Sequence, residues 1–256
     1  MLKLFSKKKE NSINIENEGE MTFLEHLEEL RWRLIYSFIG VLIGTILAWI
    51  FIDFLVEEIL LKPATKNNIP LQNLKPFGQI FLYFQIAIIA GIILSIPNIF
   101  YQLWKFISPA LRKNERKYIL AIVIFSSVCF LLGILFAYFV MLPLTLSFAS
   151  QFGTTEIKNE FAIDEYMSII ISVMLAAGLV FELPMLSFFL SKLGILTPDF
   201  MKKYRKHSLV IILIAAAVLT PGTDPVSQVI LAVPLFLLYE ISILVSKLSQ
   251  KKVVEQ

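Results

Sequence analysis

Long apolar runs alternate with short polar segments along most of this chain, and this pattern predicts a bundle of membrane helices. The first four runs contain about 20 residues or more, enough to cross a hydrocarbon core of about 30 Å at about 1.5 Å per residue. The fifth has about a dozen residues and reaches only about 20 Å, so it requires a thinner bilayer or a water-filled recess at one end. The six runs are 34–54, 77–96, 118–142, 167–190, 208–219 and 226–243.

The basic residues orient these predicted spans. Nineteen of the 23 Lys and Arg residues lie in the two tails and in every second connection, and the remaining four are Lys62, Lys66, Lys75 and Lys158. Basic residues favour the cytoplasmic side, so both termini are expected in the cytoplasm. An even number of crossings is then required, which supports counting the fifth and sixth runs as spans.

The three connections expected on the outer side differ in character. Residues 55–76 carry three prolines and cannot form one continuous helix. Residues 147–166 are acidic and are expected to cap the outer face. Residues 220–228 read TPGTDPVSQ and predict a tight turn into the last helix.

Composition agrees with this interpretation and limits the chemistry. Hydrophobic residues make up 57% of the 256 residues, and the mean hydropathy is +0.75. The expected fold class is therefore an all-α polytopic membrane protein with six transmembrane helices. Its predicted parts are a disordered polar tail over 1–20, one transmembrane domain over 21–247 and a cytoplasmic tail over 248–256. Residues 1–20 have no apolar core of the kind that marks a secretion signal.

No residue pattern points to catalysis or to a bound cofactor. The chain has one cysteine, Cys129, and two histidines, and it lacks an HExxH motif and a glycine-rich phosphate loop. We therefore predict no catalytic residues, no metal, no cofactor and no enzyme activity.

Residues 21–34 predict a short amphipathic helix where the polar tail meets the first apolar run. Thr22 and Glu25 have the spacing of a capping box, which places the start of the helix at Thr22. Glu29 has two interpretations. It can pair with Arg33 one turn along the helix, or it can join Glu115 in a receptor for a cationic peptide.

Glu115 lies in the first inner loop, where it is the only acidic residue among five basic ones. Ser108 and Pro109 are expected to end the preceding helix. Glu115 can pair with a neighbouring basic residue near a helix start, or it can face a ligand.

Glu182 lies inside an apolar run, AAGLVFELPMLSFFL. A bare carboxylate in lipid costs several kcal/mol, so it should face a cavity or a partner, or be protonated. Pro184 is expected to weaken the helix and open a recess there. The alternative is a carboxyl group that a neighbouring helix satisfies.

Five motifs in order resemble the TatC family, whose members are the polytopic receptors of the twin-arginine protein translocase. They cover nearly the whole chain from residue 21 to about residue 247. The motifs are HLEELRWRL at 26–34, PNIFYQLWKFISPALRKNERKY at 97–118, FELP at 181–184, TPGTDPVSQ at 220–228 and AVPLFLLYE at 232–240.

The resemblance implies a concave, glove-like bundle in the cytoplasmic (inner) membrane, with two short final helices and both ends in the cytoplasm. It implies a receptor that binds the paired-arginine signal peptide of folded cargo. It also implies that the proton-motive force, and no nucleotide, drives the export of that cargo. It also implies assembly into a larger complex with further copies and with single-span TatA- and TatB-type partners. The matching positions for the signal peptide are Glu25, Glu29, Arg31, Phe106, Pro109, Leu111 and Glu115.

The resemblance assigns three further positions. Glu182 matches an intramembrane polar site, and Thr220 and Gln228 match a site that contacts the single-span partners. A different class of function, a proton-coupled small-solute transporter centred on Glu182, is the alternative that the residues themselves leave open.

Overall fold

The protein is described here by a computed structural model covering residues 23–67, 69–110, 116, 119–151, 160–219 and 225–254. It is mostly helical. Within these residues, four helical stretches are long and apolar enough to cross a membrane, and a bent helix pair makes a fifth. The all-α polytopic prediction is confirmed, whereas a count of six spans remains a prediction because the remaining helix is short.

The first apolar run is a single helix, α2 (Phe23–Ile50), followed by irregular helical pieces. The helical pieces are α3 (Ile52–Phe54), the π-helix η1 (Leu55–Leu60) and α4 (Lys62–Lys66). The short strand β1 (Leu71–Gln72) follows them. Pro63 lies in the first turn of α4, where its missing N–H costs least. The expectation that this connection is not one continuous helix is confirmed. The start of α2 at Thr22 lies outside the described residues.

The second apolar run forms one helix, and the chain bends sharply at the end of that run. Helices α5 (Gly78–Leu94) and α6 (Ile96–Ile107) meet at an angle of 52°. Pro97 in the first turn of α6 cannot donate a backbone hydrogen bond back to α5, and the Ser95 hydroxyl donates to the Gly40 carbonyl of α2 at 2.7 Å. The 3₁₀ turn η2 (Ser108–Ala110) follows α6, so the predicted end of the helix at Ser108 is confirmed.

The third and fourth apolar runs form the centre of the bundle. The third continues as helix from α8 (Ile119–Phe136) through the π-helix η3 (Ala137–Met141) into α9 (Leu142–Gln151). After the strand β2 (Phe161–Ala162), α10 (Ile163–Val180) and α11 (Leu183–Lys192) form the fourth. They are separated at Phe181 and Glu182, where Pro184 enters the first turn of α11, so the predicted weakening of this helix is confirmed.

The last two apolar runs differ in length. Between α11 and the fifth run lies α12 (Pro198–Lys203). Helix α13 (Arg205–Leu219) has 15 residues and is about 22 Å long, as short as the sequence predicts. Helix α14 (Pro225–Val254) has 30 residues, but only 18 of them, from Leu231 to Leu248, form its apolar part. It continues as helix through most of the predicted tail at 248–256.

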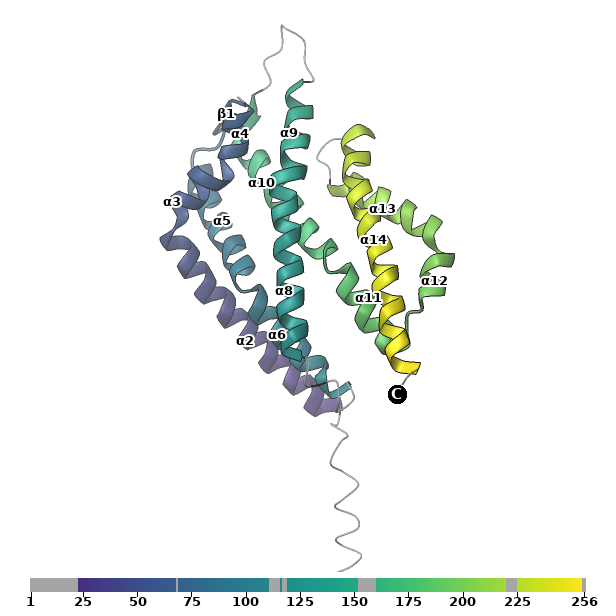
Figure 1. Cartoon of the computed structure of the whole chain (residues 1–256). Coiled ribbons are helices and arrows are strands. Elements are labelled where there is room, and N and C mark those ends of the chain that lie inside the picture. The colour runs from purple at the N-terminus through teal and green to yellow at the C-terminus, as the bar shows by residue number, and fades with distance from the viewer. Residues whose placement is uncertain are drawn as a thin grey trace, which may run out of the picture.

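The helices pack in three groups (Figure 1). Helix α2 packs on α5 and α6, the central α8 packs on α6 and α10, and α14 packs on α11 and α13. The start of α2 and the C-terminal end of α14 lie at the same end of the bundle, at the lower side of Figure 1. Helix α4 and β1 lie at the opposite end, where β1 pairs with β2 in parallel and Leu71 is opposite Phe161. We call α4, β1 and β2 the cap.

Small residues allow α2 and α5 to approach closely. A Cβ on Gly91 would lie 2.5 Å from the backbone nitrogen of Thr45, and one on Gly44 would lie 2.6 Å from the Gly91 carbonyl oxygen. Close backbone approach through small residues is a common way to pack helices in membranes, where hydrophobic burial does not drive association.

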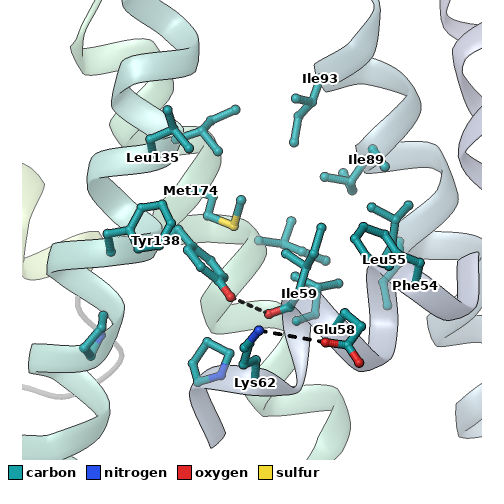
Figure 2. Close-up of a pocket in the computed structure, with 18 of the residues that line it drawn as sticks. Phe54, Leu55, Glu58, Ile59, Lys62, Ile89, Ile93, Leu135, Tyr138 and Met174 are labelled. Carbon is teal, nitrogen blue, oxygen red and sulfur yellow. Dashed lines mark hydrogen bonds and ion pairs between the residues drawn. The ribbon is translucent and has the colours of Figure 1, made fainter. Parts of the chain in front are cut away.

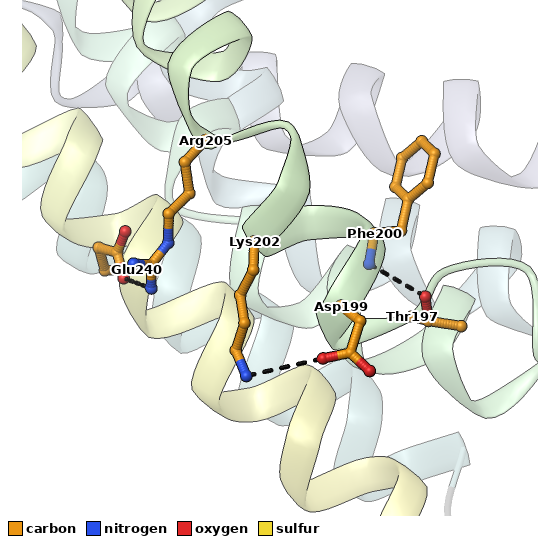
Figure 3. Close-up of polar contacts among 6 residues, drawn as sticks. All are labelled: Thr197, Asp199, Phe200, Lys202, Arg205 and Glu240. Carbon is orange, nitrogen blue, oxygen red and sulfur yellow. Dashed lines mark hydrogen bonds and ion pairs between the residues drawn. The ribbon is translucent and has the colours of Figure 1, made fainter.

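Polar contacts around α12 fix the connection between α11 and α13 (Figure 3). The Thr197 hydroxyl accepts a hydrogen bond from the Phe200 N–H, which caps α12. Arg205 forms an ion pair with Glu240 of α14 at 2.7 Å. Glu240 lies near the end of a predicted span, where contact with water could be enough to accommodate its charge. In the structure, however, its carboxylate has Arg205 as a specific partner.

An ion pair next to the cap, between Lys75 and Asp164 at the start of α10, predicts a pH dependence. The Lys75 ammonium lies 2.7 Å from the Asp164 carboxylate, and this hydrogen bond raises the pKa of Lys75 above its ordinary value of 10.5. Because the pKa is higher in the folded chain, the contribution of this pair is fully present below pH 10.5 and is lost as the pH rises above it. The melting temperature should therefore show a step to lower values in that range. The Asp164→Asn variant should lack this step, and an unchanged step in the variant would contradict the assignment.

Candidate functional site

The first candidate site lies where the start of α2 meets the end of α6. Glu29 and Arg33 form an ion pair at 2.8 Å across one turn of α2, and each side chain is 18% exposed. The other arm of Arg33 donates to the Gln102 side chain of α6 at 3.3 Å. The interpretation that Glu29 pairs with Arg33 is therefore confirmed, and α6 takes part in holding the pair.

Aromatic stacking joins the same two helices closer to their ends. The His26 ring of α2 stacks on the Phe106 ring of α6, with centroids 4.3 Å apart and an angle of 14° between the planes. Further along the contact, Asn98 donates to the Tyr36 carbonyl and accepts from Gln102. These contacts hold the first part of α2 against α6.

The ion pair leaves polar atoms available. One oxygen of Glu29, Oε2, and the Nε of Arg33 are buried and have no hydrogen-bond partner among the described residues. A buried polar atom without a partner costs about 1–3 kcal/mol, more when it is charged. This carboxylate can therefore gain from a further hydrogen-bond donor.

The other residues predicted for peptide binding fall into two groups. Arg31 and Glu25 are exposed on α2, and the Pro109 carbonyl accepts a hydrogen bond from Arg116 at 3.2 Å. Glu115 and Leu111 lie outside the described residues. The structure therefore brings Glu29 and Phe106 to one contact region and does not test the position of Glu115.

Glu182 occupies the break between α10 and α11. It is only 7% exposed, and its Oε1 has no hydrogen-bond partner among the described residues. The carboxyl group lies against α8, next to Ser126 and the Phe130 backbone. The sequence left open a cavity, a partner, a protonated carboxyl group or a neighbouring helix, and the structure places this carboxyl group in a buried position beside α8.

The predicted partner site is only partly described. The Gln228 side chain donates to the Leu213 carbonyl at 2.8 Å and thereby links α14 to α13. Thr220 lies outside the described residues. Gln228 thus has a structural contact in addition to the partner contact that the resemblance implies.

Sequence reasoning missed Gln102 and Asn98, which connect α6 to the Glu29 region. Both lie at helical spacing with Phe106, four residues apart along one face of α6. That spacing is a signal that could have identified them. Among the described residues, no cluster of three or more His, Cys, Asp or Glu side chains could hold a metal ion.

Comparisons with known proteins agree on one family. A family profile described as "Sec-independent protein translocase protein (TatC)" matches residues 25–234. Proteins of that name from Carboxydothermus hydrogenoformans and Aquifex aeolicus are each 39% identical to this chain. Each alignment covers 91% of this chain, with 95% of the first relative and 97% of the second.

A solved structure shares the fold. The crystal structure described as "Twin Arginine Translocase Receptor- TatC" superposes with a TM-score of 0.77 at 39% identity, and it covers 88% of this chain and 100% of its own. These matches do not support the small-solute transporter interpretation. The chain belongs to the TatC family of Sec-independent protein translocase proteins.

Proposed function

We propose that this chain is the receptor subunit that binds paired-arginine signal peptides at the start of α2. The observation that carries the proposal is the buried oxygen of Glu29 that has no partner among the residues the structure describes, beside the contact between His26 and Phe106. The TatC family assignment supports a role in protein transport.

Arginine fits this site for chemical reasons. A guanidinium group stays charged at physiological pH and can donate two parallel hydrogen bonds to one carboxylate. Arg33 already donates to Oε1 of Glu29, so an incoming guanidinium can replace Arg33, or it can donate to the buried Oε2 once the Glu29 side chain turns toward the surface. The aromatic pair beside it offers a planar surface on which a guanidinium can stack.

The second acidic residue in the proposal is Glu115. It belongs to the same inner loop as Phe106 and Pro109, so a peptide with two adjacent arginines could contact Glu29 with one and Glu115 with the other. In this arrangement Leu111 and Phe106 contact the apolar residues of the peptide, and the exposed Glu25 and Arg31 border the site.

The test is the affinity of a paired-arginine peptide for the purified protein in lipid nanodiscs. The Glu29→Gln and Glu115→Gln variants should each lose about tenfold or more in affinity, because a hydrogen bond to a charged group contributes about 1.5–3 kcal/mol. A peptide with paired lysines should bind the unchanged protein more weakly, because lysine cannot form the two-point contact.

Glu28→Gln is the matched control, because Glu28 is the adjacent acidic residue and its side chain is exposed. It removes the same charge from the same helix and should retain nearly full affinity. Equal affinity of the Glu29→Gln/Glu115→Gln double variant and the unchanged protein would overturn the proposed site.

Three further features belong to the proposal. The chain lies in the cytoplasmic membrane with both termini on the cytoplasmic side. It assembles with single-span TatA- and TatB-type proteins, whose contact includes Thr220 and Gln228 next to the short α13. Cargo movement depends on the proton-motive force, and Glu182 provides the intramembrane polar site.

Co-purification from native membranes, compared between the unchanged protein and Gln228→Leu, tests the partner contact.

A further inference from the structure

A large apolar pocket lies between the cap end of the bundle and its centre (Figure 2). Its volume is about 740 Å³, and its walls come from the segment after α2, from α5, from α8 with η3, and from α10. Most lining side chains are aliphatic or aromatic, among them Ile89, Ile93, Leu135 and Met174. We call it the α5–α8 pocket.

Charged groups lie at one end of this pocket only. Figure 2 shows Glu58 and Lys62 at one end, whereas Ile93 and Leu135 lie toward the other. Glu58 and Lys62 are 3.8 Å apart and more than half exposed, which makes a weak pair. Lys66 also lines this end and has no ionic partner among the described residues.

The polar groups deeper in the wall are already used within the protein. The Tyr138 hydroxyl donates to the Ile59 carbonyl at 2.8 Å, and the Asn67 side chain donates to the Pro63 carbonyl at 2.8 Å. A ligand in the pocket would therefore meet an apolar interior and an entrance with two lysines and one glutamate, which carries a net positive charge. This arrangement matches an amphipathic molecule with an anionic head.

The volume distinguishes between a lipid chain and a peptide helix. A helix about 10 Å wide with a rise of about 1.5 Å per residue fills about 120 Å³ per residue, so the pocket would hold only about six residues. That is less than two turns. A flexible acyl chain is narrower and can follow an irregular space.

The dispersion contacts of the apolar pocket walls also favour an acyl chain as the occupant. Apolar side chains that line an empty space lose dispersion contacts, which an apolar occupant restores. In a bilayer, acyl chains are the apolar molecules that surround the protein. A chain that enters the pocket restores these contacts without exposing apolar surface to water.

We propose that the α5–α8 pocket binds one glycerophospholipid, with an acyl chain along Ile89, Ile93 and Met174 and its phosphate near Lys62 and Lys66. This site is separate from the start of α2, so it stands or falls independently of signal-peptide binding.

The experiment measures lipid that stays bound through purification. The protein is extracted from native membranes, washed with increasing detergent and analysed by native mass spectrometry. The unchanged protein should retain about one phospholipid per chain. In the Ala90→Phe variant, which fills the pocket, retention should fall at least about fivefold. In the Lys62→Gln/Lys66→Gln double variant, whose changed side chains are exposed, the lipid should be lost at a lower detergent concentration.

Matched controls keep the result specific. Ala121→Phe adds the same bulk at an exposed position of α8, and Lys203→Gln/Lys247→Gln removes two charges away from the pocket. Both should retain lipid as the unchanged protein does. The absence of retained lipid in the unchanged protein, or equal retention in the Ala90→Phe and Ala121→Phe variants, would overturn the proposal.

A photoreactive amino acid at Met174 identifies the occupant directly. Irradiation in native membranes should give an adduct with the mass of a phospholipid. An adduct with a polypeptide alone would assign the pocket to a peptide and overturn the lipid proposal.

Discussion

Replacing Gly133 by Leu is expected to lower the melting temperature of the detergent-solubilised protein by about 6–12 °C. A Cβ on Gly133 would lie 2.6 Å from the Ala177 carbonyl oxygen and 2.8 Å from the Gly178 Cα. Both obstacles are backbone atoms of α10, which cannot rotate away as a side chain can. The larger residue must separate α8 from α10, and we expect this overpacking to cost about 3 kcal/mol.

Ala121→Leu is the control for this prediction, because it lies on the same helix and its side chain is exposed. Its expected change in the free energy of unfolding is within about 0.5 kcal/mol. Gly133→Ala should fall between the two. If Gly133→Leu and Ala121→Leu melted at the same temperature, the close packing of α8 on α10 would be wrong.

The second large effect is expected from Tyr166→Phe. Tyr166 is fully buried, and its hydroxyl donates to the Leu60 carbonyl at 2.9 Å and accepts from the Ala64 N–H at 3.0 Å. The Ala64 N–H belongs to the first turn of α4, where no backbone partner exists within the helix. Removal of the hydroxyl leaves two buried backbone groups unsatisfied, at an expected cost of about 2–3 kcal/mol.

Thermal unfolding and hydrogen exchange over residues 55–67 measure this effect. Tyr138→Phe provides the comparison, because its hydroxyl makes one hydrogen bond, to Ile59, and its side chain is only half-buried. We expect a cost of about 1 kcal/mol there. Equal losses in the two variants would show that Tyr166 does not anchor η1 and α4 to α10.

The two predictions concern the same part of the molecule as the lipid proposal. The α5–α8 pocket borders η1 and α4 on one side and α8 and α10 on the other. Gly133 and Tyr166 therefore hold two of its walls. A loss of lipid in either variant should accompany a lower melting temperature, whereas Ala90→Phe should lose lipid through occupation of the space.

The sequence predicted well those features that depend on local chemistry. The predicted end of a helix at Ser108 and the predicted weakening at Pro184 are both observed, because proline removes a backbone donor wherever the chain places it. The short fifth run became the 15-residue α13, because the length of an apolar run limits the length of the span. The acidic character of the α2 start and the ion pair of Glu29 with Arg33 also follow from spacing within one helix.

Tertiary packing decided the contacts that join distant residues. Arg33 reaches Gln102 across 69 positions of the chain, and Tyr166 reaches Ala64 across 102. The stacking of His26 on Phe106, the parallel pairing of β1 with β2 and the α5–α8 pocket are further cases. No periodic pattern encodes these pairs, because each depends on how two distant elements lie against each other rather than on the residues within either one.

The sequence by itself therefore determined the environment of this protein, its helices and the chemical character of its candidate binding end. The tertiary structure determined which helix faces which, and with it the burial of one Glu29 oxygen and the shape of the pocket. The physical reason is the range of the interactions: hydropathy and backbone breaks act along a few turns of chain, whereas packing selects among faces that are almost equally apolar.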